Sequence, residues 1–391
     1  MRLSGGVHLA YCTNIHRGET WTETFDALQR HTLAVREHVC PGQPYAIGLR
    51  LSNQASRELS EPATRRAFQQ WLDQRQCYVF TINGFPYGPF HGTRVKEQVY
   101  APDWTTRERL EFTNRLFDLL AELVPAGVEG SVSTVPGSFK EFISREEQVR
   151  AMRAHLWQCV DHIARVSRRS GKKLHLGLEP EPLCYLETSA ETVEFFGQMR
   201  EDRPGDERLD EHLGVNYDTC HLAVEFEEPQ AVVQRFQQHG IQISKIHVSS
   251  ALKVRSTPEV CQALRAFADD TYLHQVIERN AEGTLTRYRD LDEAVSPQDA
   301  TRKPQSTEWR IHFHVPLHSQ PTPLFDNTSE HALGLFKVLQ QQPALCRHLE
   351  METYTWEVMP PELKHRTVVE QLVAEYDWTL RRLAEHGLRP A

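Results

Sequence analysis

The chain has 391 residues, a formal net charge of −9, 39% hydrophobic residues and 25% charged residues, which describes an ordinary globular protein of one large domain or two average ones. The acidic balance argues against a nucleic-acid partner, and no apolar run approaches the roughly 20 residues that cross a bilayer, so membrane insertion is not expected either. Eight scattered cysteines without a CxxC pair, and a first segment without signal-peptide character, predict a cytoplasmic protein with reduced thiols.

Segments of strand character alternate with segments of helical periodicity in the first half of the chain. The expected strands are 7–13, 45–51, 77–82 and 129–135, and the expected helices are 22–39, 58–72, 105–124 and 144–170. Thr105 with Glu108, and Ser144 with Glu147, have the spacing of capping boxes that begin the last two helices. Residues 84–104 form a long irregular connection, which predicts a functional loop or lid over the strand ends.

The alternation continues in the second half. The expected strands are 174–179, 214–218, 243–249 and 349–355, and the expected helices begin at 188, 229, 257, 327 and 363. Residues 269–308 are polar and irregular, and we expect them to form an insertion. Residues 309–316 read as a short strand or an extended loop, and we place them in the excursion after the seventh strand.

Strands that alternate with helices every 30 to 45 residues or so indicate a parallel sheet. Eight such units with a closing helix favour a (β/α)8 TIM barrel over an open sheet. The chain has no Gly-x-Gly-x-x-Gly after its first strand and no Walker A sequence, so nucleotide-binding doubly wound folds lose their main support. We therefore predict an α/β protein whose single TIM-barrel domain spans 1–391, with an insertion after the seventh strand and a C-terminal helix.

Acidic and imidazole side chains fall at the ends of four predicted strands. They are Glu179, Asp218, His247 and Glu352. The carboxyl ends of barrel strands share one rim and carry the active site, and carboxylates with imidazole suit Zn, Mn, Mg or Fe. Taken singly, each residue has a simpler interpretation as a helix cap, an ion pair or a satisfied core group. Taken together, their matching positions predict a divalent metal site.

The motifs at these positions resemble those of the xylose-isomerase-like TIM barrels, which include sugar-phosphate isomerases and epimerases and the apurinic endonucleases. The matching stretches are L-x-L-E, D-T-C-H, I-H-V, a His-x-His segment and M-E-T, between residues 174 and 356. The resemblance gives the shared metal positions to the same four residues.

The endonuclease branch of this superfamily implies further ligands. His221 matches the His of its D-x-x-H motif, and His312 and His314 stand where the branch has an acidic-x-His pair. The replacement of the acidic residue by His312 leaves the metal and the number of ions open, between one and three.

A second resemblance covers the length of the chain. Y-C-T-N-I-H-x-G-E-T-W at 11–21, N-G-F-P-Y-G-x-F-H at 83–91 and V-K-E-x-V-Y-x-P-D-W at 95–104 are similar to EboE-type metabolite traffic proteins. These proteins are encoded in bacterial clusters associated with the export of a secondary-metabolite precursor. The resemblance implies a small-molecule metabolite and other proteins of the pathway as partners, without an established reaction.

Candidate substrate contacts come from the first half of the chain. His8, Asn14 and His16 lie along and just after the first predicted strand, and His91 and Lys96 lie on the long loop. Lys96 would neutralise an anionic substrate, and an exposed loop lysine is an equally good interpretation.

Three functions fit these observations. The first is isomerisation or epimerisation of a small polyhydroxylated or carbonyl compound, in which a divalent ion binds two substrate oxygens. Glu179 or Glu352 would act as the proton-transfer base, and Glu181 would be another base or would position a ligand. The second is metal-dependent phosphoester hydrolysis, and the third is metabolite binding by a non-catalytic escort protein.

Overall fold

The computed structural model describes residues 1–296, 308–359, 364 and 366–391. Eight parallel strands form one sheet in the order β1-β13-β7-β6-β5-β4-β3-β2. Their bounds are β1 (His8–Tyr11), β2 (Tyr45–Arg50), β3 (Cys77–Asn83), β4 (Gly130–Thr134), β5 (Leu174–Leu178), β6 (Leu213–Asp218), β7 (Gln242–Val248) and β13 (His348–Met351). A parallel bridge between Cys12 and Gly48 joins the two ends of the sheet beside β1 and β2. The predicted (β/α)8 barrel is therefore confirmed.

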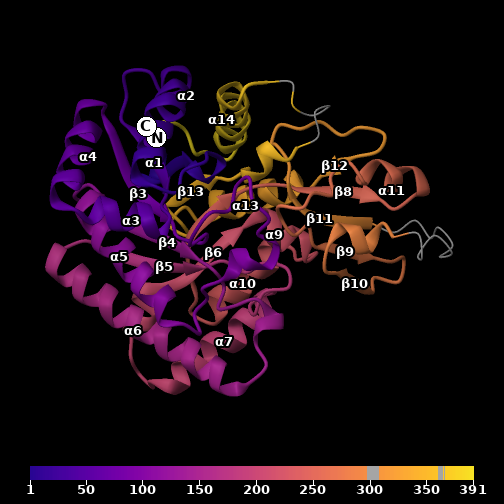
Figure 1. The fold of residues 1–391 in the computed structure, drawn as a ribbon, viewed down its shortest axis with the longest axis horizontal. Coiled ribbons are helices and arrows are strands. Elements are labelled where there is room, and N and C mark those ends of the chain that lie inside the picture. The colour runs from indigo at the N-terminus through magenta and orange to yellow at the C-terminus, as the bar shows by residue number, and fades with distance from the viewer. Residues whose placement is uncertain (297–307, 360–363, 365) are drawn as a thin grey trace.

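The strands are buried on both faces, because side chains fill the barrel interior and helices cover its outside (Figure 1). Every residue of β1, β2 and β6 is buried. The α-helices outside the second sheet's segment are α1 (Trp21–Ala27), α2 (Leu33–Val39), α3 (Asn53–Ser60), α4 (Pro62–Gln74), α5 (Arg107–Leu123), α6 (Glu146–Ser170), α7 (Ser189–Asp202), α8 (Arg208–His212), α9 (Thr219–Val224), α10 (Pro229–Gln238), α13 (Ser329–Gln341) and α14 (Val368–Glu385).

The two predicted capping boxes of the first half do not form as expected. Helix α5 begins after Thr106, and Thr105 instead donates to the carboxylate of Asp103. Helix α6 begins after Arg145, so that Gln148, rather than Glu147, accepts from the backbone N–H of the N-cap residue. Several nearby polar side chains can bond the free backbone N–H groups of a helix's first turn, so the first residue of the helix can shift by one position.

The chain between β7 and α13 builds a second, antiparallel sheet in the order β10-β9-β11-β8-β12. Its elements are β8 (Ala251–Arg255), α11 (Pro258–Leu264), β9 (Val276–Arg279), β10 (Leu285–Tyr288), α12 (Leu291–Ala294), β11 (Glu308–His314) and β12 (Asp326–Asn327). Figure 1 shows it as a lobe on one side of the barrel. Strand β11 pairs antiparallel with β8 and β9, so this segment belongs to the excursion, as expected. The described residues of the predicted insertion, 269–296 and 308, lie inside this longer stretch, and they contain β9, β10 and α12 rather than only irregular chain. Its remaining residues, 297–307, lie outside the described part of the chain.

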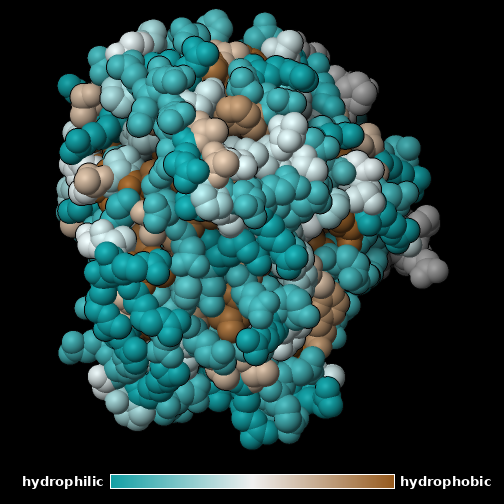
Figure 2. Space-filling model, turned by 60° about the vertical axis from the view of Figure 1, so that its left-hand side comes forward, coloured by the Kyte–Doolittle hydropathy of each residue, from teal (hydrophilic) through white to brown (hydrophobic). Residues whose placement is uncertain are grey.

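Apolar side chains of the barrel form one large cluster, and the second sheet buries a smaller cluster of its own around Leu264, Phe267 and Ile311. A single domain for 1–391 stays a prediction. Hydrophilic residues cover most of the face seen in Figure 2, and the apolar residues there form small separate patches. Among the described residues, no helix has both the length and the apolar character needed to cross a membrane.

Candidate metal centre

Four side chains converge at the C-terminal ends of neighbouring strands. Glu179 directly follows β5, Asp218 is the last residue of β6, His247 lies near the end of β7, and Glu352 directly follows β13. Asp218 and His247 are register partners across the β6–β7 pair. One ligand atom from each of the four lies within 4.8 Å of the others, and all four residues are buried. The structure thus brings together the residues that the sequence predicted as the shared metal positions.

One ring nitrogen of His247 lies at the centre of this group. Its Nδ1 is 2.9 Å from Glu179 Oε1, 3.2 Å from Glu352 Oε2 and 3.5 Å from Asp218 Oδ2. Three carboxylates this close would repel one another without a positive charge between them.

Two carboxylate oxygens of the group are buried without a hydrogen-bond partner. They are Glu179 Oε2 and Asp218 Oδ2. The other oxygen of Asp218 accepts from the N–H groups of Cys220 and His221, at 2.6 and 3.0 Å, and from Ser249 Oγ at 2.6 Å. Asp218 is therefore fixed through Oδ1 as the N-cap of α9, while Oδ2 faces the cluster. A buried carboxylate oxygen without a partner is unfavourable, and a divalent cation would satisfy both oxygens, so the residues present fit a metal ion.

The charges of these groups depend on one another. Burial opposes ionisation of Asp218, but the neighbouring His221 and His247 outweigh burial and hold the pKa of this carboxyl well below its usual value. Burial likewise opposes protonation of His247, but Glu352 and Glu179 raise the pKa of its imidazole well above the usual range. The pKa of Glu352 is lowered against the effect of burial, mainly by His247. Positive charge is thus stabilised where the carboxylates converge.

Glu350 supports the cluster from inside the barrel, and the sequence analysis missed it. Its Oε2 is 2.9 Å from His247 Nε2 and 2.5 Å from the buried ammonium of Lys245, which also donates to Ser133. A Cβ at Gly48 would collide with the carboxylate of Glu350, so the glycine leaves room for this side chain. Residues two apart on a strand share a face. The position of Glu350, two residues before Glu352, could therefore have identified it from the sequence.

Two asparagines bind the carboxylate oxygen of Glu352 that is not the one near His247. Asn14 and Asn83 donate to its Oε1 at 2.7 and 3.1 Å. Asn14 was a predicted substrate contact and lies in the 3-10 turn after β1 (Thr13–Ile15), while Asn83 ends β3. Their bonds leave Oε2 of Glu352 directed toward His247.

The additional predicted histidines lie next to the four-residue group. His221 Nε2 is 3.4 Å from His314 Nε2 and 4.0 Å from Asp218 Oδ2. Asp218, His221 and His314 form one further set of donors close enough to hold a metal ion, and Glu181, His221 and His312 form another. Burial, reinforced by His221 and His314, lowers the pKa of His312 well below its usual value.

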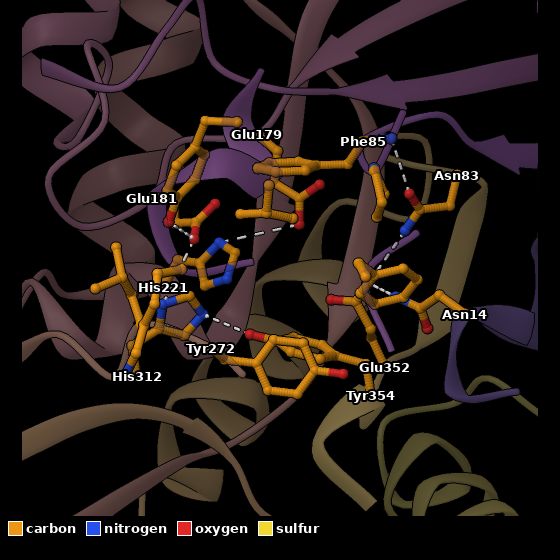
Figure 3. A pocket seen from close by; sticks show the side chains of 16 residues that line it. Asn14, Asn83, Phe85, Glu179, Glu181, His221, Tyr272, His312, Glu352 and Tyr354 are labelled. Carbon is orange, nitrogen blue, oxygen red and sulfur yellow. Dashed lines mark hydrogen bonds and ion pairs between the residues drawn. The ribbon is translucent and has the colours of Figure 1, made fainter. Parts of the chain in front are cut away.

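A cavity of about 60 Å3 opens beside the carboxylates (Figure 3). The walls come from the rim, the long loop, the second sheet and the turn after β13, and they include Asn14, Asn83, Phe85, Pro86, Phe90, Lys96, Val99, Tyr100, Glu179, Glu181, His221, Tyr272, Leu273, His312, Glu352 and Tyr354. The long loop, with its 3-10 turn (Lys96–Tyr100), therefore lies at the same end of the barrel as Asp218, as predicted for a lid.

Glu181 lies in this cavity and accepts a 2.6 Å hydrogen bond from the Tyr100 hydroxyl. Burial, together with the nearby charges of Glu179, Asp218 and Glu352, raises its pKa well above the usual value although the bond from Tyr100 opposes the shift. Its carboxyl is 3.5 Å from His312 Nδ1, a position from which it can exchange a proton with a ligand.

Four predicted substrate contacts lie outside the centre of the site or are already engaged. His8 is the first residue of β1, at the opposite end of the barrel, and bonds Tyr78. His16 bonds Tyr11 and stacks on His31, away from the cavity. His91 links Asn14 O to the Tyr272 hydroxyl, at 2.5 and 2.7 Å, behind the cavity wall. Lys96 lines the cavity, but its ammonium group is 2.7 Å from Asp290 Oδ2.

Comparisons with known proteins support the architecture. No family model matches the chain, and no curated protein matches it either. Among solved structures, an L-ribulose 3-epimerase is 12% identical with a TM-score of 0.52, over 99% of this chain and 96% of that one. A xylose isomerase-like TIM barrel protein from Mycobacterium smegmatis, in complex with magnesium, is 12% identical with a TM-score of 0.52, over 99% of each chain.

The IOLI protein with a bound zinc atom is 11% identical with a TM-score of 0.51, over 97% of this chain and 99% of that one. At such identities the likeness concerns the fold alone. The chain therefore has the xylose-isomerase-like form of the TIM barrel.

Proposed function

We propose that this protein is a divalent-metal-dependent isomerase or epimerase of a small polyhydroxylated or carbonyl compound. The observation that carries the proposal is the convergence of Glu179, Asp218, His247 and Glu352 within 4.8 Å at the strand ends. The chemistry of the donors, three carboxylates and one imidazole, suits Mn, Mg, Zn or Fe. The magnesium and zinc in two similar structures, and the epimerase activity named for a third, support the same proposal.

The bound ion would supply Lewis-acid stabilisation of negative charge on substrate oxygens. Glu179 and Glu352 are the proposed proton-transfer residues, because both border the cavity. Oε2 of Glu179 has no hydrogen-bond partner, and Oε2 of Glu352 is the oxygen that the asparagines leave free. Asn14 and Asn83 fix Glu352 through its other oxygen, so that its orientation is set before a substrate binds. Glu181, held by Tyr100, is the proposed second proton carrier on the far side of the cavity.

The proposal is tested on the full chain after incubation with MnCl2, ZnCl2 or MgCl2 and removal of unbound ions. We expect one ion per chain by elemental analysis. The Asp218→Asn variant should lose most of it, because asparagine keeps the Oδ1 acceptor that caps α9 and replaces the cluster-facing oxygen. A panel of ketoses in D2O should then show metal-dependent exchange of a carbon-bound proton by NMR. Full metal retention by the variant would contradict the metal site, and exchange independent of metal would contradict the mechanism.

A second candidate function is metal-dependent phosphoester hydrolysis. It is favoured by the additional donor sets around His221, which could hold one or two further ions. Two or three ions per chain, with release of phosphate from a phosphoester, would favour hydrolysis over isomerisation.

The EboE-like motifs of the first half support a further proposal about context. We propose that the reaction belongs to the processing or export of a secondary-metabolite precursor, together with other proteins of that pathway. Eight free cysteines, seven of them buried, support the proposed cytoplasmic location. Metal-dependent binding of a precursor without any turnover would favour the escort role instead.

A further inference from the structure

We infer that the substrate is an uncharged compound with an apolar portion, and that phosphorylated compounds are excluded from the cavity. The inference rests on the proposed function and adds the substrate class to it. Two features of the cavity carry it, namely that no Lys or Arg among its described lining residues is unpaired, and that several of its lining side chains are aromatic.

Three carboxyl groups, those of Glu179, Glu181 and Glu352, line the cavity, and Lys96 is the single Lys or Arg among its described lining residues. The Lys96 ammonium group is 2.7 Å from both Asp290 Oδ2 and Asp269 O. It therefore has a carboxylate partner before any ligand arrives.

Other groups that commonly bind phosphate are also engaged. Arg50 lies beneath Phe90, with its guanidinium 5.0 Å from the ring centre, and donates to Gly18 O, Glu19 and Gly88 O. The first free N–H groups of α9, at the rim of the barrel, already donate to Asp218. Phosphate sites in proteins use Arg, Lys or such N–H groups, and Lys96, Arg50 and these N–H groups of α9 all have partners already.

A bound divalent ion would not reverse this balance. When His247 is neutral, as a metal ligand must be, the three carboxylates around it carry more negative charge than one divalent ion neutralises. A phosphate dianion in the same buried volume would add like charge where screening by water is weak. Exclusion of phosphorylated compounds is therefore an electrostatic property of the site.

Part of the cavity wall is aromatic. Phe85 and Phe90 come from the long loop, Tyr272 from the second sheet's connection, and Tyr354 from the turn after β13. In Figure 3 the rings of Tyr272 and Tyr354 lie on the side of the cavity away from Glu179. The hydroxyl of Tyr272 bonds His91 and that of Tyr354 lies 3.4 Å from His312 Nε2, so the rings, rather than the hydroxyls, are left for a ligand. Such a wall binds the hydrocarbon face of a molecule whose oxygens reach the metal centre.

The test uses metal-chelating probes that share one hydroxamate head and differ in their tails. Acetohydroxamic acid has a methyl tail, 3,3-dimethylbutanohydroxamic acid a neopentyl tail, and phosphoglycolohydroxamic acid a tail of similar size that ends in phosphate. Calorimetry on the manganese-loaded full chain, with the EDTA-treated chain as reference, measures each affinity. We expect the neopentyl probe to bind about tenfold or more tighter than acetohydroxamate, and the phosphate probe to bind more weakly than acetohydroxamate.

Two variants locate the effects. Tyr272→Ala should reduce the advantage of the neopentyl probe about tenfold while acetohydroxamate affinity changes little, and Tyr272→Phe, which keeps the ring, should resemble the wild type. Asp290→Asn, which removes the partner charge of Lys96, should raise the affinity for the phosphate probe several-fold.

The outcomes separate the inference from the proposed function. Tightest metal-dependent binding of the phosphate probe, or equal binding of the methyl and neopentyl probes, would overturn the inference and leave the metal-dependent function standing. If no probe binds better to the manganese-loaded chain than to the EDTA-treated chain, the proposed function fails and the inference fails with it.

Discussion

Glu350 Oε2 lies 2.9 Å from His247 Nε2, the ring nitrogen that the three rim carboxylates do not contact. With Nε2 donating to Glu350, Nδ1 of a neutral ring would offer its lone pair to an ion held by Glu179, Asp218 and Glu352. A carboxylate on the far nitrogen of a histidine ligand fixes the ring and increases its basicity. Glu350 is therefore a positioning residue of the proposed metal centre, held in turn by Lys245.

Glu350→Gln should lower the affinity for Mn2+ about 10- to 100-fold, because the amide holds the His247 ring less firmly. Metal titration by calorimetry measures the change. The substitution also leaves Lys245 buried without its ion-pair partner.

The double variant Glu350→Gln with Lys245→Met is the matched control, because removal of both charges avoids an uncompensated buried ammonium group. We expect the double variant to recover stability in chemical denaturation but not metal affinity. Recovery of metal affinity in the double variant would show that the effect of the single substitution arises from misfolding.

Arg287 of β10 joins the second sheet to the barrel. Its guanidinium lies 2.5 Å from Glu225 Oε2 and 3.0 Å from Glu187 Oε1, and the Glu225 side chain is fully buried. Arg287→Ala should lower the free energy of unfolding by about 1–3 kcal/mol, because it leaves a buried polar group without its partner. Urea denaturation measures the loss. Arg382→Ala, which breaks an exposed pair on α14 with Glu385, is the control and should change stability by about 0.5 kcal/mol or less. Equal effects of the two substitutions would refute the anchoring role.

His8 should be dispensable for the metal centre. It lies at the start of β1, where its ring bonds Tyr78 and stacks on Phe80, and not at the C-terminal end where the donors meet. His8→Gln should leave metal content and hydroxamate affinity within about twofold of the wild type, a change of well under 1.4 kcal/mol. Asn14→Ala, just past the other end of the same strand, should weaken both because it removes a bond to Glu352. A large loss of metal in His8→Gln would show that the two ends of the barrel are coupled.

Glu375 should make stability depend on pH between about 4.5 and 7. Burial raises the pKa of this α14 carboxyl from 4.5 to about 7, although Thr353 and the Leu317 N–H donate to it. A folded-state pKa above the unfolded value means that the group contributes most below pH 4.5, and that this contribution is lost as pH rises through 7. Glu375→Gln should remove this dependence, so that the variant gains up to about 3 kcal/mol over the wild type between pH 4.5 and pH 8.5. Denaturation at both pH values measures it, and parallel pH profiles of the two proteins would contradict the assignment.

The architecture was accessible from the sequence because each barrel unit is local. Hydrophobic strands, helical periodicity and intervening turns each depend on neighbours within about 30 residues, and the parallel order of eight such units leaves few alternatives. The positions of Glu179, Asp218, His247 and Glu352 followed from the same logic, since the last residue of every barrel strand reaches one rim. His8 shows the limit of this logic, because one strand has two ends and a histidine at its first residue lies at the wrong one.

By itself, the sequence determined the barrel, the placement of 309–316 outside it and the candidate ligands at the rim. Only the tertiary structure decided that Glu350 reaches His247 across the space beside Gly48, that Asp290 engages Lys96, and that Tyr272 and Tyr354 share a wall with Phe90. The physical reason is the range of the interactions. A strand-end position is set by backbone geometry within one unit, whereas the partner of a buried charge and the walls of a cavity are set by side chains far apart in the chain, which meet only when the barrel closes and the second sheet packs against it.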